Sequence, residues 1–237
     1  MSDFPKVIML FAAGFGTRMG ALTAHCPKPL IKVAGRALID HALDLADGAG
    51  VAGKVVNLHY LAPMLAQHLA LRRDVALSHE APLVLETGGG LKHALPLLGD
   101  GPVFTLNTDA VWAGVNPLEI LRAAWRPGAM DALLLLAPAD RARGHKGSGD
   151  FTLLADGQIS RGGAMVYLGA QILCTDGLAA VDQPAFSLNV LWDSAMARGR
   201  VFGVLYPGLW CDVGQAESIA LAEAMLAETI SPAVSDV

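Results

Sequence analysis

The sequence predicts an α/β fold in which largely parallel strands form a sheet covered by helices on both faces. Short, continuous apolar runs alternate with segments whose apolar residues recur at helical spacing, and this β-α-β-α rhythm is typical of such folds. The composition agrees: 53% of the 237 residues are hydrophobic and 16% are charged, against roughly 25% charged in a typical domain. A chain of this kind buries a large core.

The first half of the chain supplies the regular alternation. Strands are predicted at residues 6–12, 54–60, 75–79, 103–106 and 131–137, and helices at residues 37–49, 62–71, 88–98 and 117–125. Pro63 and Pro117 lie at helix starts, where the missing amide proton removes no hydrogen bond. In sheets of this kind, ligands bind beyond the carboxyl ends of the strands.

The second half is less regular, with residues 140–163 rich in Gly, Arg and Asp. Strands are predicted at residues 151–154, 165–168 and 201–206, and helices at 188–197 and 218–228. We predict a single domain over residues 1–230, with a nucleotide-binding half at about 1–137 and a substrate-facing half at about 138–215. Residues 231–237 are expected to be a frayed tail.

Charge and cysteine usage exclude several classes of function. The net charge of −5, with no basic block, argues against nucleic-acid binding. Cys26, Cys174 and Cys211 are widely spaced without a zinc-ligand pattern, which favours a reduced, cytoplasmic setting. No apolar run is long enough to cross a membrane, so no membrane partner is expected. The oligomeric state is left open.

The stretch LFAAGFGTRMGALTAHCPKPLIKVAG, residues 10–35, predicts a phosphate-binding loop. Gly14 and Gly16 follow a strand, but Met19 breaks the GxGxxG pattern, and no Walker A loop exists. Arg18 offers a bidentate fork for phosphate, and Lys28, fixed between two prolines, offers a point charge. Glycine turns and loop cations are common singly, yet together on the binding edge they favour a phosphate site.

Asp109 and Asp212 each end a strand-like run, in NTDA and WCDVG. Acidic residues at such positions often cap helices or accept loop hydrogen bonds. The alternative is a Mg²⁺ site, because Mg²⁺ takes one or two carboxylates together with phosphate oxygens and water. We predict that both aspartates converge on one Mg²⁺ ion.

Three glycines open the predicted helix in LETGGGLKHAL, residues 85–95, although glycine destabilises helices. Two explanations stay open. Bare backbone at Gly88 and its neighbours admits a flat or anionic ligand, or the segment is a loop with a weak helix start capped by Glu86 and Thr87.

Together these motifs resemble the sugar-1-phosphate nucleotidyltransferase family. Its hallmark LAAGxGxRM…T…PKPL appears as LFAAGFGTRM…LT…PKPL, and ETGGG, NTDA, GDF and WCDVG follow in family-like order. LETGGG with GDF is most similar to uridylyltransferases of N-acetylmuramate-1-phosphate, which act in recycling of cell-wall peptidoglycan sugars. The resemblance implies a Rossmann-like, three-layer α/β/α fold with a mixed, mostly parallel sheet. It also implies attack of a sugar-1-phosphate on the α-phosphorus of an NTP, with release of pyrophosphate.

The resemblance also implies a role for each matching residue. Arg18 and Lys28 are the expected catalytic residues, and Asp109 and Asp212 the expected Mg²⁺ ligands. The expected nucleotide-binding residues are Ala12, Ala13, Gly14, Gly16, Thr17, Glu86, Thr87, Gly88 and Asn107. On the sugar side it points to Gly149 and Asp150, and to Lys146 or Arg161 in place of a second lysine that the family often carries.

Besides the missing second lysine, two further departures and four alternatives accompany this prediction. Thr108 stands where the family often has Gly or Ser, and Gln215 follows WCDVG where Thr-Pro is usual. The enzyme alternatives are a cytidylyltransferase acting on phosphocholine, a mannose- or glucose-1-phosphate nucleotidyltransferase, and a glycosyltransferase that consumes nucleotide sugars. The non-enzyme alternative is a nucleotide-binding regulator, which is disfavoured because all four charged site residues are present.

Overall fold

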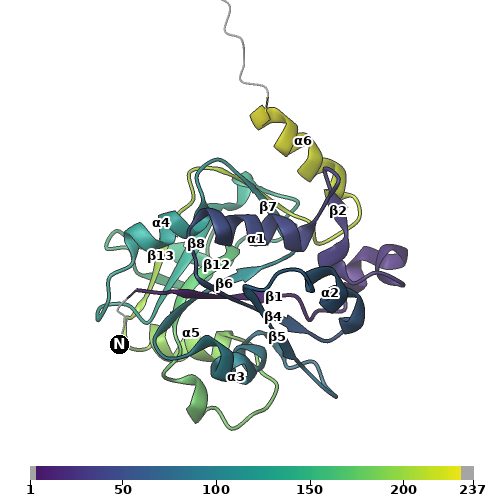
Figure 1. Ribbon diagram of the computed structural model, residues 1–237. Helices are drawn as coiled ribbons and strands as arrows, with labels where there is room; N and C mark the ends of the chain where they lie inside the picture. The colour runs from purple at the N-terminus through teal and green to yellow at the C-terminus, as the bar shows by residue number, and fades with distance from the viewer. Residues whose placement is uncertain (1–3, 231–237) are drawn as a thin grey trace, which may run out of the picture.

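The computed structural model describes residues 4–230, and a nine-stranded sheet runs through them (Figure 1). Its main path has the order β11-β10-β12-β6-β1-β4-β5, and β8 pairs with both β12 and β13. The strands are β1 (Val7–Phe11), β4 (Gly53–Leu58), β5 (Val75–His79), β6 (Pro102–Asn107), β8 (Ala132–Pro138), β10 (Phe151–Leu153), β11 (Ile159–Arg161), β12 (Met165–Cys174) and β13 (Val201–Leu205).

The sheet is mixed, as the family resemblance implies. β6, β1, β4 and β5 pair in parallel, and so do β8 and β13. β12 is antiparallel to both β6 and β8, and β10 and β11 add an antiparallel edge. Strands from both halves of the chain therefore share one sheet, and the parallel strands β1, β4 and β6 end at the same edge.

Helices cover both faces of this sheet (Figure 1). α1 (Leu38–Gly48), α2 (Ala62–Leu69) and α4 (Pro117–Ala124) pack on one face, and α3 (Glu86–Leu98) and α5 (Asn189–Met196) on the other. Strand β1 shows why its apolar run is continuous: Ile8 and Leu10 enter the first core, whereas Met9 between them enters the second.

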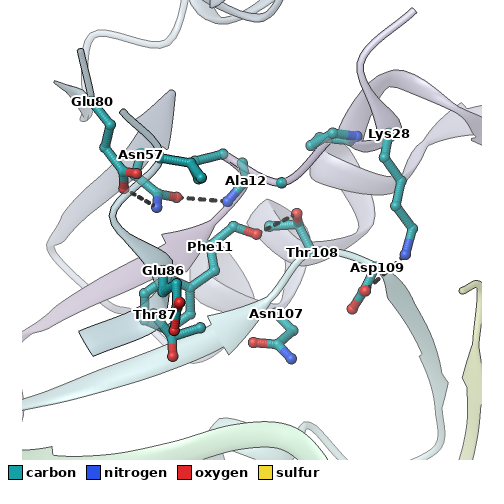
Figure 2. A pocket seen from close by; sticks show the side chains of 14 residues that line it. Phe11, Ala12, Lys28, Asn57, Glu80, Glu86, Thr87, Asn107, Thr108 and Asp109 are labelled. Atoms are coloured by element: carbon teal, nitrogen blue, oxygen red, sulfur yellow. Dashed lines mark hydrogen bonds and ion pairs between the residues drawn. The ribbon is translucent and has the colours of Figure 1, made fainter. Parts of the chain in front are cut away.

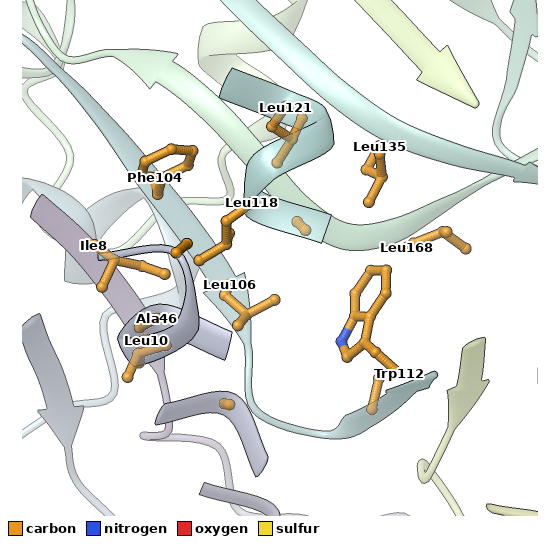
Figure 3. Packing of buried hydrophobic residues seen from close by; sticks show 14 of the residues in the cluster. Ile8, Leu10, Ala46, Phe104, Leu106, Trp112, Leu118, Leu121, Leu135 and Leu168 are labelled. Carbon is orange, nitrogen blue, oxygen red and sulfur yellow. The ribbon is translucent and has the colours of Figure 1, made fainter. Parts of the chain in front are cut away.

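The first core is formed by buried side chains from several helices and strands (Figure 3). Leu118 and Leu121 of α4 pack against β6, where Phe104 and Leu106 are fully buried. Burying one such side chain stabilises the fold by about 1.5–3 kcal/mol. This packing holds β6 in place, and the end of β6 carries part of the site described below.

A separate three-stranded sheet, β7-β14-β9, lies beside the main one. It contains β7 (Ala110–Ala113), β14 (Leu209–Asp212) and β9 (Ala142–Arg143) and packs under α6 (Ser218–Ile230). A short hairpin, β2 (Lys32–Val33) with β3 (Arg36–Ala37), follows two 3₁₀ turns, η1 (Thr17–Thr23) and η2 (Lys28–Leu30). η3 (Ala139–Arg141) and η4 (Leu178–Ala180) are further 3₁₀ turns in the second half.

Three details differ from the sequence prediction. Short strands such as β7 and β11 are additional, α3 begins at Glu86, and β12 continues to Cys174. The extension of β12 was hidden by Gly169, which has φ of 83° and lies where the pairing with β8 shifts register. A Cβ at Gly169 would lie 2.9 Å from the Asn107 side chain, so glycine gives Asn107 its space.

None of the helices within residues 4–230 combines the length and the apolar character needed to cross a membrane. The predicted tail, residues 231–237, lies outside the described residues.

Candidate active site

A pocket of about 220 Å³ opens where β1, β4 and β6 end (Figure 2). This is the edge at which parallel α/β sheets bind ligands. Its walls come from the start of the glycine loop, from η2, from the ends of the strands and from the start of α3. The lining residues are 11–14, Lys28, Pro29, Asn57, Glu80, Val84, Glu86, Thr87 and 107–109.

Lys28 and Asp109 meet on one side of this pocket. The Lys28 Nζ atom lies 2.8 Å from Asp109 Oδ2, and the two side chains are 11% and 33% exposed. Pro27 and Pro29 frame Lys28 in the single turn η2, closed by a hydrogen bond from the Leu30 amide to the Pro27 carbonyl. The lysine is therefore held by backbone geometry, and its ammonium group lies at the pocket wall.

The pairing of β14 with β7 brings Asp212 close to Asp109. Asp109 lies in the turn from β6 to β7, and Asp212 ends β14, where it pairs with Ala110. The Val213 amide donates a 2.8 Å hydrogen bond to the Asp109 carbonyl. Gly214 makes room for the Asp212 carboxylate, because a Cβ there would lie 2.8 Å from its Oδ2.

The pKa of Asp212 depends on the charges around it, including that of Asp109. Burial, and then the nearby Asp109 carboxylate, raise its pKa, while the cations Lys28 and Arg18 and the ring of His145 act in the opposite direction. Two carboxylates this close suit a divalent cation. No group of three or more His, Cys, Asp or Glu within residues 4–230 is arranged to hold a metal, so other ligands would have to come from phosphate and water, as Mg²⁺ prefers.

Only the first part of the glycine loop, up to Gly14, lines the pocket. Apart from Gly14 and its two neighbours in the chain, no atom of the described residues lies within 4 Å of the position a Cβ would take at Gly14, whereas at Gly16, with φ of 65°, it would lie 3.0 Å from Lys28 Cβ. Gly16 thus allows the loop to turn tightly around Lys28. Thr17 and Arg18 follow in η1, both exposed and outside the pocket lining.

The peptide between Phe11 and Ala12 is held from two sides. The Phe11 carbonyl accepts a 2.8 Å hydrogen bond from Thr108 Oγ1, and the Ala12 amide donates a 2.6 Å bond to Asn57 Oδ1. The amide of Ala12 is therefore committed within the protein. Thr108 still presents Asp109 to the pocket, despite its departure from the family pattern.

Packing explains the three glycines of α3. The Gly88 and Gly89 amides donate hydrogen bonds of 2.8 and 3.0 Å to the Phe186 carbonyl. A Cβ on Gly88 would overlap the Phe186 ring, and one on Gly90 would lie 2.5 Å from Glu80 Oε1. The Gly88 amide thus has a partner inside the protein, and Gly88 does not line the pocket.

Glu86 and Thr87 do line the pocket, so the first turn of α3 faces it. Leu85, at the N-cap position of α3, makes no capping hydrogen bond with its side chain, and Thr87 Oγ1 accepts a 3.0 Å hydrogen bond from the Leu188 amide. Asn107, at the end of β6, lines the facing wall.

The predicted sugar-side residues lie outside the pocket lining. Asp150 Oδ2 accepts a 2.9 Å hydrogen bond from the Tyr167 amide, and Gly149, with φ of 120°, leaves no room for a Cβ. Arg161 forms a 2.7 Å ion pair with Asp193 and lies over aromatic rings. Lys146 donates to the side chain of Gln215, just beyond β14.

Asn57 and Glu80 are among the pocket residues that sequence reasoning missed. Each is 3% exposed, and Asn57 Nδ2 donates a 2.7 Å hydrogen bond to Glu80 Oε1. The signal for Asn57 was a single amide in the buried strand KVVNLHY, and Glu80 follows the strand VALSH. A lone polar residue in such a run needs a buried partner.

Fold and site together define an α/β nucleotidyltransferase. The family model of the MobA-like NTP transferase domain supports this, because it matches residues 8–198. The chain belongs to this family and, within it, to the sugar-1-phosphate nucleotidyltransferases.

Two relatives are similar over nearly their whole length. The N-acetylmuramate alpha-1-phosphate uridylyltransferase of Caulobacter vibrioides is 44% identical, over 96% of this chain and 100% of its own. The enzyme of that name from Neisseria meningitidis is 31% identical, over 92% and 96% of the two chains.

Solved structures share the fold. HddC from Yersinia pseudotuberculosis, complexed with GMP-PN, superposes with a TM-score of 0.76 at 16% identity and covers 93% of this chain and 99% of its own. UDP-glucose pyrophosphorylase complexed with UDP-glucose gives a TM-score of 0.75 at 16% identity, over 94% and 99%. These likenesses confirm the predicted fold.

Proposed function

We propose that this nucleotidyltransferase moves the uridylyl group of UTP to N-acetylmuramate-1-phosphate, with Mg²⁺ as its cofactor. The observation that carries the proposal is the 44% identity to a uridylyltransferase of that sugar phosphate, over almost the entire chain. In the reaction, a phosphate oxygen of the sugar-1-phosphate forms a bond to the α-phosphorus of UTP. The bond from that phosphorus to the bridging oxygen breaks, and pyrophosphate leaves with the electron pair.

Lys28 is the group we assign to the α-phosphate. Its ammonium lies on the wall of the pocket that Gly14 and Asp109 also border. A fixed positive charge there neutralises charge that moves across the phosphates during attack, and reactions of this type depend mainly on positioning and charge neutralisation. Lys28 therefore has the place and the charge for a catalytic role.

Asp109 and Asp212 are the residues that would hold Mg²⁺. Their carboxylates are close enough for Asp109 to raise the pKa of Asp212, and Gly214 leaves space for the Asp212 carboxylate. When bound, the ion neutralises the phosphates and orients them. The Asp109 carboxylate would then interact with two cations, the Lys28 ammonium and the bound ion.

Arg18 and Thr17 lie in η1, next to the pocket. The Arg18 charge acts on Asp212, so the guanidinium is near the proposed metal position. We assign Arg18 to the departing β- and γ-phosphates, for which a planar, bidentate donor is suited. Ala12, Ala13, Gly14, Gly16, Glu86, Thr87 and Asn107 are the residues we assign to the base, ribose and loop contacts.

A guanylyltransferase reaction is the second candidate. The mannose-1-phosphate guanylyltransferase catalytic subunit beta of Dictyostelium discoideum is 35% identical, but over only 44% of this chain and 30% of its own. That match supports nucleotidyl transfer in general. The uridylyltransferases match both halves of the chain, which favours UTP and N-acetylmuramate-1-phosphate, and hence a place in recycling cell-wall sugars.

Pyrophosphate release tests the proposal. Each of the four NTPs is combined with N-acetylmuramate-1-phosphate, glucose-1-phosphate, mannose-1-phosphate and phosphocholine, with Mg²⁺ or with excess chelator. We expect release with UTP and N-acetylmuramate-1-phosphate and its loss with chelator. Preference for another pair would overturn the proposed substrates, and full activity in chelator would overturn the proposed cofactor.

A further inference from the structure

Glu80 and Asn57 are two buried polar residues at the base of the pocket. Both border it, yet each is only 3% exposed. So little accessible surface leaves almost no area for contact with a ligand. Any contribution to function must pass through the residues that they hold in place.

Figure 2 shows Asn57 between Glu80 and Ala12, with a hydrogen bond to each. Asn57 Oδ1 accepts a 2.6 Å hydrogen bond from the Ala12 amide, and Asn57 Nδ2 donates a 2.7 Å bond to Glu80 Oε1. Glu80 Oε2 accepts a 2.7 Å bond from the Leu85 amide. Ala12 begins the glycine loop and Leu85 precedes α3, so the chain of bonds spans both walls.

The donors around this pair require a carboxylate at position 80. Both Glu80 oxygens accept a hydrogen bond, one from a side-chain amide and one from a backbone amide. A neutral carboxamide at position 80 would have only one acceptor oxygen, and its NH2 group would face one of these two donors. That donor would then be buried without an acceptor, which is destabilising. Gly90 packs directly against Glu80 Oε1, which leaves little freedom to rearrange.

The strand end held by this pair is fixed on its other side as well. Thr108 Oγ1 donates a 2.8 Å hydrogen bond to the Phe11 carbonyl, which belongs to the peptide whose amide Asn57 holds. The orientation of that peptide determines the direction in which Ala13 and Gly14 enter the pocket.

We propose that Glu80 is a positioning residue which, through Asn57, fixes the first peptide of the glycine loop relative to α3. This sets the separation of the two walls between which the nucleotide binds. The inference rests on the proposed function in one respect, namely that the nucleotide occupies this pocket. It assigns Glu80 and Asn57 no contact with the reacting phosphates.

Exchanging the two functional groups tests the proposal. Glu80→Gln alone sets a donor against a donor, and Asn57→Asp alone sets one carboxylate against another. In the double variant, the new carboxylate at position 57 accepts from the Ala12 amide and from the new carboxamide at position 80. The oxygen of that carboxamide accepts from the Leu85 amide. Every bond is thereby restored with the charge moved, so the double variant should recover what each single variant loses.

The readout is nucleotide affinity, measured by calorimetry and as KM. We expect each single variant to weaken nucleotide binding by about tenfold or more, and the double variant to return to within about threefold of wild type. The KM for the sugar phosphate should change by less than about twofold, because neither side chain reaches the residues assigned to it. A general loss of stability would not produce this split or this rescue.

Tyr206→Phe is the matched control. It removes a buried hydroxyl that donates to the Ala113 and Val115 carbonyls outside the pocket lining. We expect lower thermal stability with unchanged nucleotide affinity. Glu80→Gln with wild-type affinity, or a double variant as weak as the single ones, would overturn the proposal. If a single variant does not fold, the nucleotide affinity of the double variant decides: an affinity within about threefold of wild type supports the proposal, and a weaker one overturns it.

The nucleotide used is the one that wild type prefers among the four NTPs. If this is not UTP, the proposed substrate is wrong, and the Glu80→Gln and Asn57→Asp variants are tested with the nucleotide that wild type prefers. If wild type uses UTP but the exchange shows no rescue, the positioning role fails and the proposed function stands.

Discussion

Lys28 Nζ lies 2.8 Å from Asp109 Oδ2, although the two residues belong to different elements and different motifs. The pair places the proposed catalytic ammonium and one proposed metal ligand within a single contact. Asp109 thus orients Lys28 toward the pocket, and the carboxylate stays partly exposed for a cation. Loss of either partner leaves the other charge uncompensated in a partly buried site.

Lys28→Ala should lower kcat/KM by at least about 100-fold, because a preorganised charge at the transferring phosphate is lost. Circular dichroism and thermal melting should show a folded protein. Lys32→Ala is the matched control, since Lys32 is an exposed lysine nearby in the sequence, and it should keep wild-type turnover. Near-normal turnover in Lys28→Ala would remove Lys28 from the mechanism.

Asp212→Asn should be more stable than wild type at neutral pH in metal-free buffer, yet inactive. Burial and the Asp109 carboxylate raise the pKa of Asp212 above its ordinary value of 3.8. The folded state therefore holds this proton more tightly than the unfolded chain does, so wild-type stability falls as pH rises through the interval between the two pKa values.

Thermal melts with and without Mg²⁺ measure this effect. The Tm of Asp212→Asn should exceed that of wild type at pH 7 and converge with it below about pH 3.8, where Asp212 is protonated in both states. Mg²⁺ should raise the Tm of wild type and not of the variant, because only a site that binds the ion is stabilised by it. A variant that is less stable at pH 7 would contradict the argument.

Two glycine substitutions should separate ligand contact from packing. Gly14→Ala places a methyl group with no atom of the described residues within 4 Å except those of residue 14 and its two chain neighbours, on a residue that lines the pocket, so it should leave Tm unchanged and raise the nucleotide KM. Gly88→Ala drives a methyl group into the Phe186 ring, so it should destabilise the protein by about 1–3 kcal/mol. Urea unfolding with parallel kinetics distinguishes the two, and equal losses of stability would refute the assignment.

Lys146→Ala should raise the KM for the sugar phosphate by about tenfold, since a charge-assisted contact to phosphate is lost. Lys146 bonds to Gln215, three residues after the proposed metal ligand Asp212. Arg161 is already engaged by Asp193 and Asn189, so Arg161→Ala should lower stability with less effect on that KM. Initial rates at varied sugar phosphate test both, and the reverse pattern would assign the phosphate to Arg161.

The sequence predicted the edge of the sheet and its charges because those depend on local patterns. Strands β1 and β6 read as apolar runs, and parallel strands end at a common edge, so Lys28 and Asp109 could be expected near one another. Their direct contact, and the pairing of β7 with β14 that brings Asp212 to the same place, required the three-dimensional structure.

Features that depend on contacts between distant segments could not be read from spacing. The bond from Asn57 to Glu80 joins strand β4 to the residue that follows β5, and the glycines of α3 make room for Phe186, in a later part of the chain. Gly169 looked like the end of a strand, whereas it forms an irregularity within β12 opposite Asn107. In each case the sequence gives the residue type, but it does not show which residue lies next to it in the folded protein.

The most direct test of the central claim is product analysis with the purified protein, UTP, N-acetylmuramate-1-phosphate and Mg²⁺. The account predicts one pyrophosphate released for each UDP-linked N-acetylmuramate found by mass spectrometry, and no product with Lys28→Ala. A wild-type enzyme that forms no product from this pair, while turning over another nucleotide or acceptor, would contradict it.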